Sequence, residues 1–404
     1  MIQPLLQSAD LRGAARLTTD AVAGMASLVE ALHAGVGSGL RLRSTVEAVD
    51  RCRGLSGLVY KTVRGVTRRV GGNAEVLLAM LGPALADPDA RVPIRLKREA
   101  VVAALNGVLG DYLAATDNPL AVTMAFRQSG QAVPLDRFDL RPRATRVTPR
   151  LLVMLHGLCM SDLQWRRAGH DHGEALARDL GYSPIYLHYN SGLSVSTNGR
   201  LLAQLMERLY DAWPVPIERL SMVGHSMGGL VARSAIHHGG LIRRGALRWP
   251  ARLNDLICLG TPHQGAPLER AGHRLDLLLG AIPYAAPLAR LGKVRSAGIS
   301  DLRWGNIVSP PVNQHGTYRC AQVRLPARTR CHAIAASLGP AAESLTSRLL
   351  GDGLVPVASA LGQHPEPARR LDFEPGHQAV VFDSGHLDLL SSAEVYGLLH
   401  RWLS

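Results

Sequence analysis

Ser226 lies two residues from a glycine on either side in the segment Gly224-His225-Ser226-Met227-Gly228. The segment follows the apolar run Leu220–Val223 and precedes a run of helix-forming residues. This order predicts a sharp strand–turn–helix connection, in which glycines permit a strained turn and close backbone contact. The chemistry that it suits is nucleophilic attack by the Ser226 hydroxyl, at the start of a helix where developing negative charge is stabilised. The residues expected to support this turn are Gly224, His225 and Gly228.

A serine hydroxyl is a weak nucleophile until a base takes its proton, and that base needs an acid to orient it. His386 is the predicted base, because it follows the last apolar run, Ala379–Phe382, and so lies at the carboxyl end of a strand. Asp352 is the predicted acid, because it lies between two glycines on a loop beyond the apolar run around Ile334. The chain order serine, acid, histidine fits a strand–turn–helix serine. Other candidates for the two roles are Asp301, Asp372, Asp383, His364 and His377.

A second glycine turn, His156-Gly157-Leu158, ends the apolar run Leu151–Leu155. Attack on a carbonyl carbon produces an oxyanion, which two preset backbone N–H groups can stabilise. We expect the N–H of Met227, next to the serine, to supply one donor and the N–H of Leu158 to supply the other. His156 and Gly157 would then shape the loop that carries the second donor.

The elements that must position these residues follow one another after residue 118. A hairpin is predicted from Val122–Arg127 and Gln131–Leu135, which flank a Ser-Gly turn. Short apolar runs then alternate with helical patterns such as Leu201–Ala212 and Leu230–His237. Such alternation predicts a mostly parallel sheet with helices on both faces. The predicted strands are Leu151–Leu155, Ile185–Tyr189, Leu220–Val223, Leu256–Leu259, His332–Ala336 and Ala379–Phe382.

From about Val122 to Ser404 the chain resembles an α/β-hydrolase of the lipase and esterase kind. The segments that carry the resemblance are LLVMLHGLCMSDLQW, MVGHSMGGLVAR, LGTPHQGAP, GDGLVP and SGHLDLL. The segment around His263 is similar to one in bacterial triacylglycerol lipases and inositol-deacylase-like proteins, where it shapes a loop beside the site. The resemblance implies an α/β-hydrolase fold with these site residues: Ser226 as nucleophile, Asp352 as acid, His386 as base, and Leu158 and Met227 as oxyanion donors.

The activity expected from these residues is hydrolysis of a carboxylic ester through an acyl-enzyme, with no metal and no cofactor. The expected substrate is an ester with an acyl or lipid-like group. Two alternatives stay open: acyl transfer to an alcohol by the same triad, and lipid binding by a site that has lost its activity. Access of water to the acyl-enzyme distinguishes the first alternative, and the second predicts loss of a catalytic group.

Two further regions are predicted from pattern alone. Residues 1–118 show amphipathic helical periodicity and form a predicted N-terminal helical region, with residues 119–404 as the hydrolase domain. Residues 266–317 depart from the strand–helix alternation and contain apolar stretches interrupted by prolines. They are predicted to form a cap or lid over the site, the alternative being an ordinary packing element.

The composition limits the partners of this chain of 404 residues. The net charge is +13, but the arginines that carry nearly all of the positive charge are spread along the chain, so we do not expect nucleic-acid binding. No apolar stretch is long enough to span a bilayer, and the N-terminus lacks the pattern of a signal peptide. A cytoplasmic location is therefore expected, and the oligomeric state is left open.

The N-terminal helices are predicted to pack against the hydrolase domain or one another, near the mouth of the site, because their apolar faces need cover. Peripheral membrane contact is not favoured, since residues 1–118 carry a net charge of only +3 and contain no tryptophan. A truncated chain starting near Pro119 should therefore be poorly soluble. Salt-sensitive flotation of the full-length protein with anionic liposomes, together with a soluble and fully active truncation, would contradict this prediction.

Overall fold

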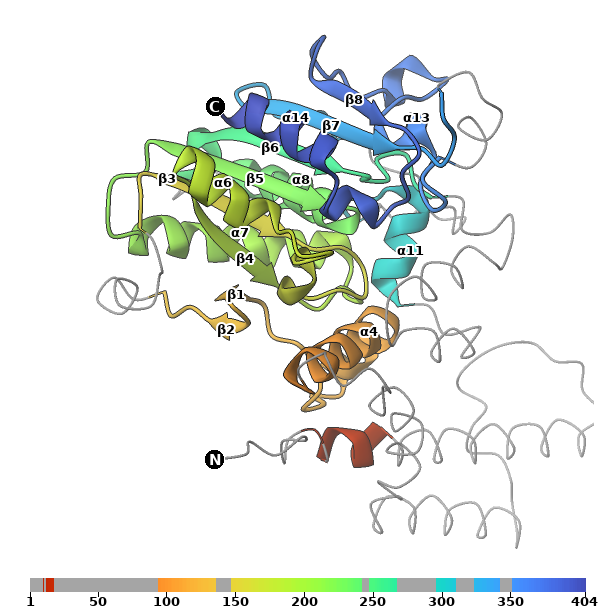
Figure 1. The fold of residues 1–404 in the computed structure, drawn as a ribbon. Coiled ribbons are helices and arrows are strands. Elements are labelled where there is room, and N and C mark those ends of the chain that lie inside the picture. The colour runs from red at the N-terminus through yellow and green to blue at the C-terminus, as the bar shows by residue number, and fades with distance from the viewer. Residues whose placement is uncertain are drawn as a thin grey trace, which may run out of the picture. The chain divides into compact units, whose positions relative to one another are not determined.

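The computed structural model of the protein describes residues 10, 12–17, 94–135, 147–241, 247–266, 296–309, 323–341 and 351–404 (Figure 1). The chain divides into two compact units: Met1–Arg98 with Ala115–Leu120, and Glu99–Ala114 with Ala121–Ser404. Most of the long helix α4, Ile94–Ala115, thus belongs to the second unit. The domain boundary expected at residue 118 stays a prediction.

The second unit is built on an eight-stranded sheet with the strand order β2-β1-β4-β3-β5-β6-β7-β8. Strands β3 to β8 pair in parallel, while β1 is antiparallel to both β2 and β4. The predicted mostly parallel sheet is therefore confirmed. The strands are β1 Ala125–Gln128, β2 Gln131–Ala132, β3 Arg150–Leu155, β4 Ser183–His188, β5 Arg219–His225, β6 Leu253–Leu259, β7 Arg330–Ala336 and β8 Gln378–Val381.

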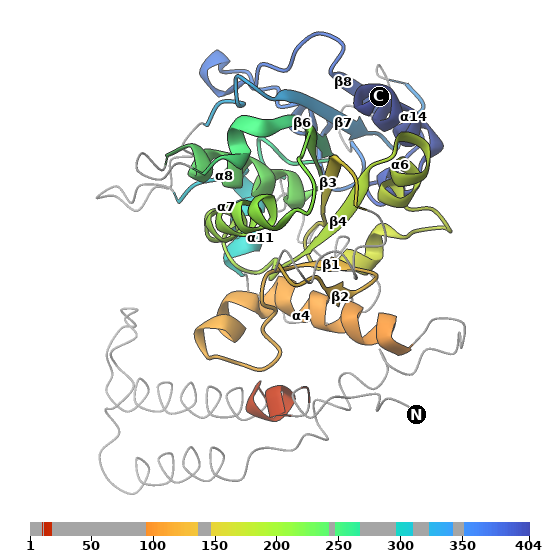
Figure 2. The ribbon, with the colours of Figure 1, turned by 90° about the vertical axis from the view of Figure 1, so that its left-hand side faces the viewer.

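Helices cover both faces of this sheet, with α7 and α8 on one face and α6 and α14 on the other (Figure 2). Successive residues of a strand point to opposite faces. Accordingly, Leu151, Val153 and Leu155 of β3 belong to the core that includes α7 and α8, whereas Leu152 and Met154 belong to the core beneath α6 and α14. The helices are α6 His172–Leu180, α7 Val195–Ala212, α8 Met227–Leu241, α11 Ala297–Trp304, α13 Val357–Ala360 and α14 Ala393–Leu403.

Polar side chains fix where several of these helices begin. The Ser194 side chain accepts from the N–H of Thr197 at the start of α7, which therefore begins six residues before the predicted Leu201. The Ser392 side chain accepts from the N–H of Val395 at the start of α14. Such caps satisfy backbone donors that the first turn of a helix leaves without partners.

The described part of the first unit is small. Arg98 pairs with Asp10 at 2.6 Å, and the Asn118 side chain donates to the carbonyl oxygen of Gly13 at 3.0 Å. These contacts join Arg98 and Asn118 to Asp10 and to the helical residues 12–17. Among the helices within the described ranges, none has the length and apolar character needed to cross a bilayer.

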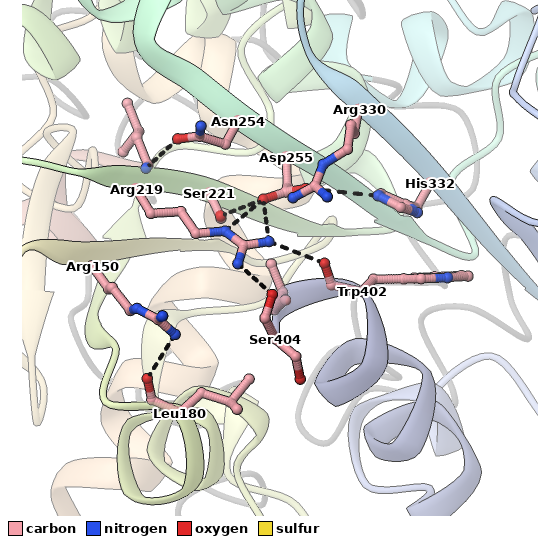
Figure 3. Close-up of polar contacts among 12 residues, drawn as sticks. Arg150, Leu180, Arg219, Ser221, Asn254, Asp255, Arg330, His332, Trp402 and Ser404 are labelled. Carbon is pink, nitrogen blue, oxygen red and sulfur yellow. Dashed lines mark hydrogen bonds and ion pairs between the residues drawn. The ribbon is translucent and has the colours of Figure 1, made fainter.

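A buried charge cluster closes the end of the sheet opposite to the carboxyl ends of the parallel strands. Asp255 is fully buried and lies 3.2 Å from the guanidinium of Arg219 and 2.8 Å from that of Arg330 (Figure 3). Arg219 also donates to the backbone oxygens of Trp402 and Ser404, at 3.1 and 2.6 Å. The cluster therefore ties three neighbouring strands to the end of α14.

We expect Asp255→Asn to destabilise the fold by about 3 kcal/mol at neutral pH, because it removes the buried negative charge that pairs with the partly buried Arg219 and the half-exposed Arg330. Burial alone would raise the pKa of Asp255, but His332, Arg219 and Arg330 outweigh it and lower that pKa below its ordinary value. The stabilisation is therefore present above pH ~4, the usual pKa of an unfolded aspartate, and is lost as the pH falls through the lower folded pKa.

Urea unfolding of the two proteins between pH 3 and pH 8 measures this difference. The exposed carboxylate of Glu366 offers a control, since Glu366→Gln should change the unfolding free energy little at any pH. An Asp255→Asn protein as stable as the wild type at pH 7 would contradict the role of the cluster.

Candidate active site

Ser226 lies between β5 and α8 with a backbone φ of 53°. This left-handed conformation is uncommon for a residue with a side chain and stores strain. Two backbone hydrogen bonds hold the turn: Ser226 N–H donates to Leu259 O at 2.8 Å, and Gly229 N–H donates to Ser226 O at 3.1 Å. Gly228 permits close contact with the loop after β3, because a Cβ there would lie 2.7 Å from the oxygen of His156. The turn is thus fixed at the carboxyl ends of the parallel strands.

Asp352 and His386 form a direct pair at the same edge, on the loops that follow β7 and β8. Nδ1 of His386 lies 2.7 Å from Oδ2 of Asp352, and both residues are buried. Oδ1 of Asp352 accepts from the N–H groups of Leu354 and Val355, at 2.9 and 2.7 Å. Because an ionised carboxylate only accepts, the imidazole proton facing it belongs on Nδ1. Nε2 of His386 then keeps the lone pair that a general base needs.

His386 lies beside the turn that carries Ser226. Its ring packs against Gly260, the residue after Leu259, since a Cβ on Gly260 would lie 3.1 Å from both Nδ1 and Cε1. His225, which precedes the serine, has its ring centroid 4.7 Å from that of His386 and its Nε2 3.1 Å from the backbone oxygen of His386. Burial lowers the pKa of His225 well below its ordinary value, so the ring is neutral and Nε2–H is the donor. The structure thereby places the predicted serine, acid and histidine together at the carboxyl ends of the parallel strands.

His156 shapes the loop that follows β3. Burial lowers the pKa of His156 to about 4, so its ring is neutral. Nδ1 lies 2.8 Å from the oxygen of Gly157 and therefore donates, which leaves Nε2 to accept the N–H of Tyr189 at 3.4 Å. The Tyr189 ring stacks on His156 with 4.3 Å between centroids, and its hydroxyl donates to the oxygen of His156 at 2.8 Å. The loop is therefore fixed through both the side chain and the backbone of His156.

The two predicted oxyanion donors lie on the segments that meet at this point. Met227 is the first residue of α8, and Leu158 is in the loop after β3; both are buried. In the part of the chain that the structure describes, neither the Leu158 N–H nor the Met227 N–H donates to a protein acceptor. The residue after Leu158, Cys159, is anchored instead, since its N–H donates to Ser191 Oγ at 3.0 Å.

Asp352 is the carboxylate that pairs with His386, and the other acidic candidates make different contacts. Asp301 accepts from the N–H of Val195 at 2.8 Å, and burial raises its pKa. Asp383 has a φ of 51° and its N–H donates to the oxygen of Gly339, while Asp372 is exposed. In the described chain, none of these three carboxylates makes a hydrogen bond or ion pair with the imidazole of His386.

The other histidine candidates contact residues outside the proposed site. His377 lies before β8, where its ring is 4.1 Å from that of His332, and His364 accepts from the N–H of Glu366 in a loop. His263 of the TPHQG segment is buried, and its Nδ1 lies 3.1 Å from the Arg233 guanidinium.

The predicted lid, residues 266–317, falls largely outside the described residues. Within it the structure describes residue 266 and residues 296–309, which include α11. Within the described ranges, no group of three or more His, Cys, Asp or Glu side chains is placed to hold a metal ion.

Two residues that support the site were not singled out from the sequence, Tyr189 and Ser191. Both lie just after β4, the strand that pairs with β3, and so next to the loop that carries Leu158. The sequence does contain a signal for them: residues with hydroxyl groups follow directly after a strand that is expected to pair with β3.

Comparisons with known proteins give one family and several structures. Residues 147–285 match the family model described as PGAP1-like alpha/beta domain, and comparison with the curated proteins gives no match. The chain is similar to the mature lipase BlEst2 of Bacillus licheniformis, at 19% identity over 65% of this chain and 95% of that one, with a TM-score of 0.41. It is also similar to EstA from Clostridium botulinum, at 12% identity over 65% and 88%, with a TM-score of 0.40. The metagenomic carboxyl esterase MGS0156 is 16% identical over 81% and 98%, with a TM-score of 0.35.

Proposed function

We propose that this protein, which has the fold of an α/β-hydrolase and a match to the PGAP1-like domain, is a serine carboxylic-ester hydrolase. One observation carries the proposal: the buried Asp352–His386 pair lies beside the strained turn of Ser226. This combination supplies a nucleophile, a base and an orienting acid in one place.

In the proposed reaction, Oγ of Ser226 attacks the ester carbonyl carbon while Nε2 of His386 takes the hydroxyl proton. Asp352 keeps Nδ1 protonated and stabilises the imidazolium that forms. His386 then gives its proton to the leaving oxygen, and the alcohol departs from an acylated Ser226. A water molecule attacks the acyl group with His386 again as base, which releases the carboxylic acid and restores the serine.

The N–H groups of Leu158 and Met227 would hold the negative oxygen of each tetrahedral intermediate. Their lack of protein acceptors in the described chain supports this role, because such donors must face the reacting atom. Losing one donor of this kind costs about 10²–10³-fold in rate. Met227 also begins α8, whose N-terminal dipole favours the same charge.

The proposed substrate is an ester with an acyl or lipid-like group, and residues 266–317 are proposed to cover it as a lid. A series of p-nitrophenyl esters from acetate to palmitate tests the proposed substrate class, with a burst of p-nitrophenol expected as the acyl-enzyme accumulates. The chain length that gives the highest kcat/KM reports the size of the acyl site.

The same assay separates the alternatives. Absence of a burst and of turnover across the whole series would contradict the hydrolase and leave lipid binding. With an added alcohol acceptor, a hydrolase should still form mainly free acid, whereas a new ester as the main product would show an acyltransferase.

A further inference from the structure

Helix α4 packs against the loop that carries the proposed donor Leu158. A Cβ added at Gly107 would lie 2.9 Å from Cα of Cys159 and closer still to its Sγ, so no side chain separates the helix from the loop. Cys159 is fully buried and has a φ of 58°, a strained conformation that the surrounding structure must hold. Burial raises the pKa of its thiol to about 12, so Cys159 acts here as a neutral packing group.

A second link runs from α4 through the loop between β4 and α7. Nδ2 of Asn190 donates to the backbone oxygen of Gly110 at 2.8 Å. The next residue, Ser191, accepts the N–H of Cys159 at 3.0 Å. The residue after Leu158 is thus held by α4 directly and again through this loop.

A third link reaches the other proposed donor, Met227, through α11. The Ser296 hydroxyl donates to the backbone oxygen of Gly107 at 2.7 Å, and the N–H of Ala297 donates to Oδ2 of Asp111 at 2.9 Å. The next residue, Gly298, packs on the loop after β4 and on the side chain of Met227, since a Cβ there would overlap the oxygen of Ser191 and lie 3.0 Å from Cε of Met227. Contacts of α4 therefore lead to the loop that carries Leu158 and, through α11, to the side chain of Met227.

Two ion pairs that share Arg127 hold the C-terminal end of the loop after β3. Arg127 lies 2.8 Å from Oε2 of Glu99 on α4 and 3.3 Å from Oδ1 of Asp162, and both carboxylates are largely buried. Asp162 begins a short 3₁₀ helix, Asp162–Trp165, at the end of the loop after β3. The loop is therefore tied to α4 at two separate points.

We infer that Gly107 is a positioning residue for the oxyanion donors, so that α4, which precedes the sheet, is part of the catalytic machinery. The inference rests on the proposed function. A small outward shift of the loop would move the Leu158 N–H away from the oxyanion while leaving Ser226, Asp352 and His386 in place. A misplacement of about 1 Å costs roughly 100-fold in rate.

The test is Gly107→Ala, with Gly397→Ala as the matched control. Gly397 lies inside helix α14, and a Cβ there would meet nothing within 4 Å, so the control makes the same helical substitution without a clash. For Gly107→Ala we expect kcat per active site to fall about 10–100-fold, with KM for a p-nitrophenyl ester changed little. Affinity for an alkyl trifluoromethyl ketone, which forms a tetrahedral adduct, should fall in parallel. Gly397→Ala should match the wild type in all three.

Active sites are counted by phosphonate titration, which removes any effect of unfolded protein on kcat. The double variant Gly107→Ala/Cys159→Ala should recover part of the lost kcat, because it removes the side chain that the new methyl group meets. If Gly107→Ala does not fold, Cys159→Ala alone decides: it leaves a gap in the same contact, and we expect kcat and ketone affinity to fall several-fold.

Wild-type kcat and ketone affinity in a folded Gly107→Ala protein would overturn the inference and leave the hydrolase proposal intact. If Gly107→Ala does not fold, wild-type kcat and ketone affinity in Cys159→Ala would overturn the inference in the same way. A wild-type protein without ester hydrolysis would instead overturn the proposed function, and this inference with it.

Discussion

Replacing Ser226 with alanine should leave a folded protein whose kcat on p-nitrophenyl esters is lower by at least ~10⁴-fold. The reason is that serine, histidine and acid act as a unit, so that removing the nucleophile removes the acyl-enzyme route altogether. The fold should survive because the turn is held by the backbone bonds to Leu259 and Gly229. Initial rates under saturating ester, together with thermal melts, measure the two expectations.

A matched control for this variant is Ser129→Ala. Ser129 also has a left-handed φ, 50°, but it is exposed in the turn between β1 and β2. The control therefore repeats the loss of a hydroxyl at the same backbone conformation, and its activity should equal that of the wild type. A serine-directed phosphonate should label Ser226 alone, and recovery of the label on another serine would show that the nucleophile lies elsewhere.

The Asp352→Asn variant should lose activity by about 10³–10⁴-fold while keeping its fold. An asparagine oxygen can still accept from the N–H groups of Leu354 and Val355. Its amide would then face Nδ1 of His386 as a donor, which forces the imidazole proton onto Nε2. A ring in that tautomer cannot take the proton from Ser226. The ratio of kcat/KM for the two proteins, measured at pH 8, tests this expectation.

Two neighbouring acids serve as controls for the second variant. Asp383→Asn and Asp372→Asn make the same chemical change on residues that do not contact His386, and both should keep most of the activity. An inactive Asp383→Asn protein beside an active Asp352→Asn protein would mean that the acid had been assigned to the wrong loop.

The parallel sheet could be predicted because its strands are continuous apolar runs, but their ends could not. The predicted strand Leu220–Val223 extends in the structure to Arg219 and His225. The two residues at the ends of the strand, Arg219 and His225, are polar, and Asp255 and the backbone of His386 supply their partners. Hydropathy does not detect a polar residue whose partner is distant in the sequence.

The order of glycines and polar residues along the chain predicted the residues proposed as catalytic. The packing of α4 against the loops that support them could not be predicted from the sequence. The amphipathic periodicity predicted for residues 1–118 does not separate buried from exposed positions of α4 reliably, since the large ring of Tyr112 is 40% exposed. The contacts that matter there are made by Gly107 and Gly110, which carry no hydropathy signal. Gly107 meets Cys159, 52 residues further along the chain, and Gly110 meets Asn190, 80 residues further along, and no local pattern can pair such distant segments.

The left-handed turn at position 226 also restricts which nucleophiles this scaffold can adopt over evolutionary time. Threonine carries two heavy atoms on Cβ, and a branched side chain at a φ of 53° collides with its own backbone. Cysteine has a single substituent on Cβ and suits the same backbone as serine. A switch from oxygen to sulfur is therefore sterically open at this position, while the other natural hydroxyl is excluded by the turn itself.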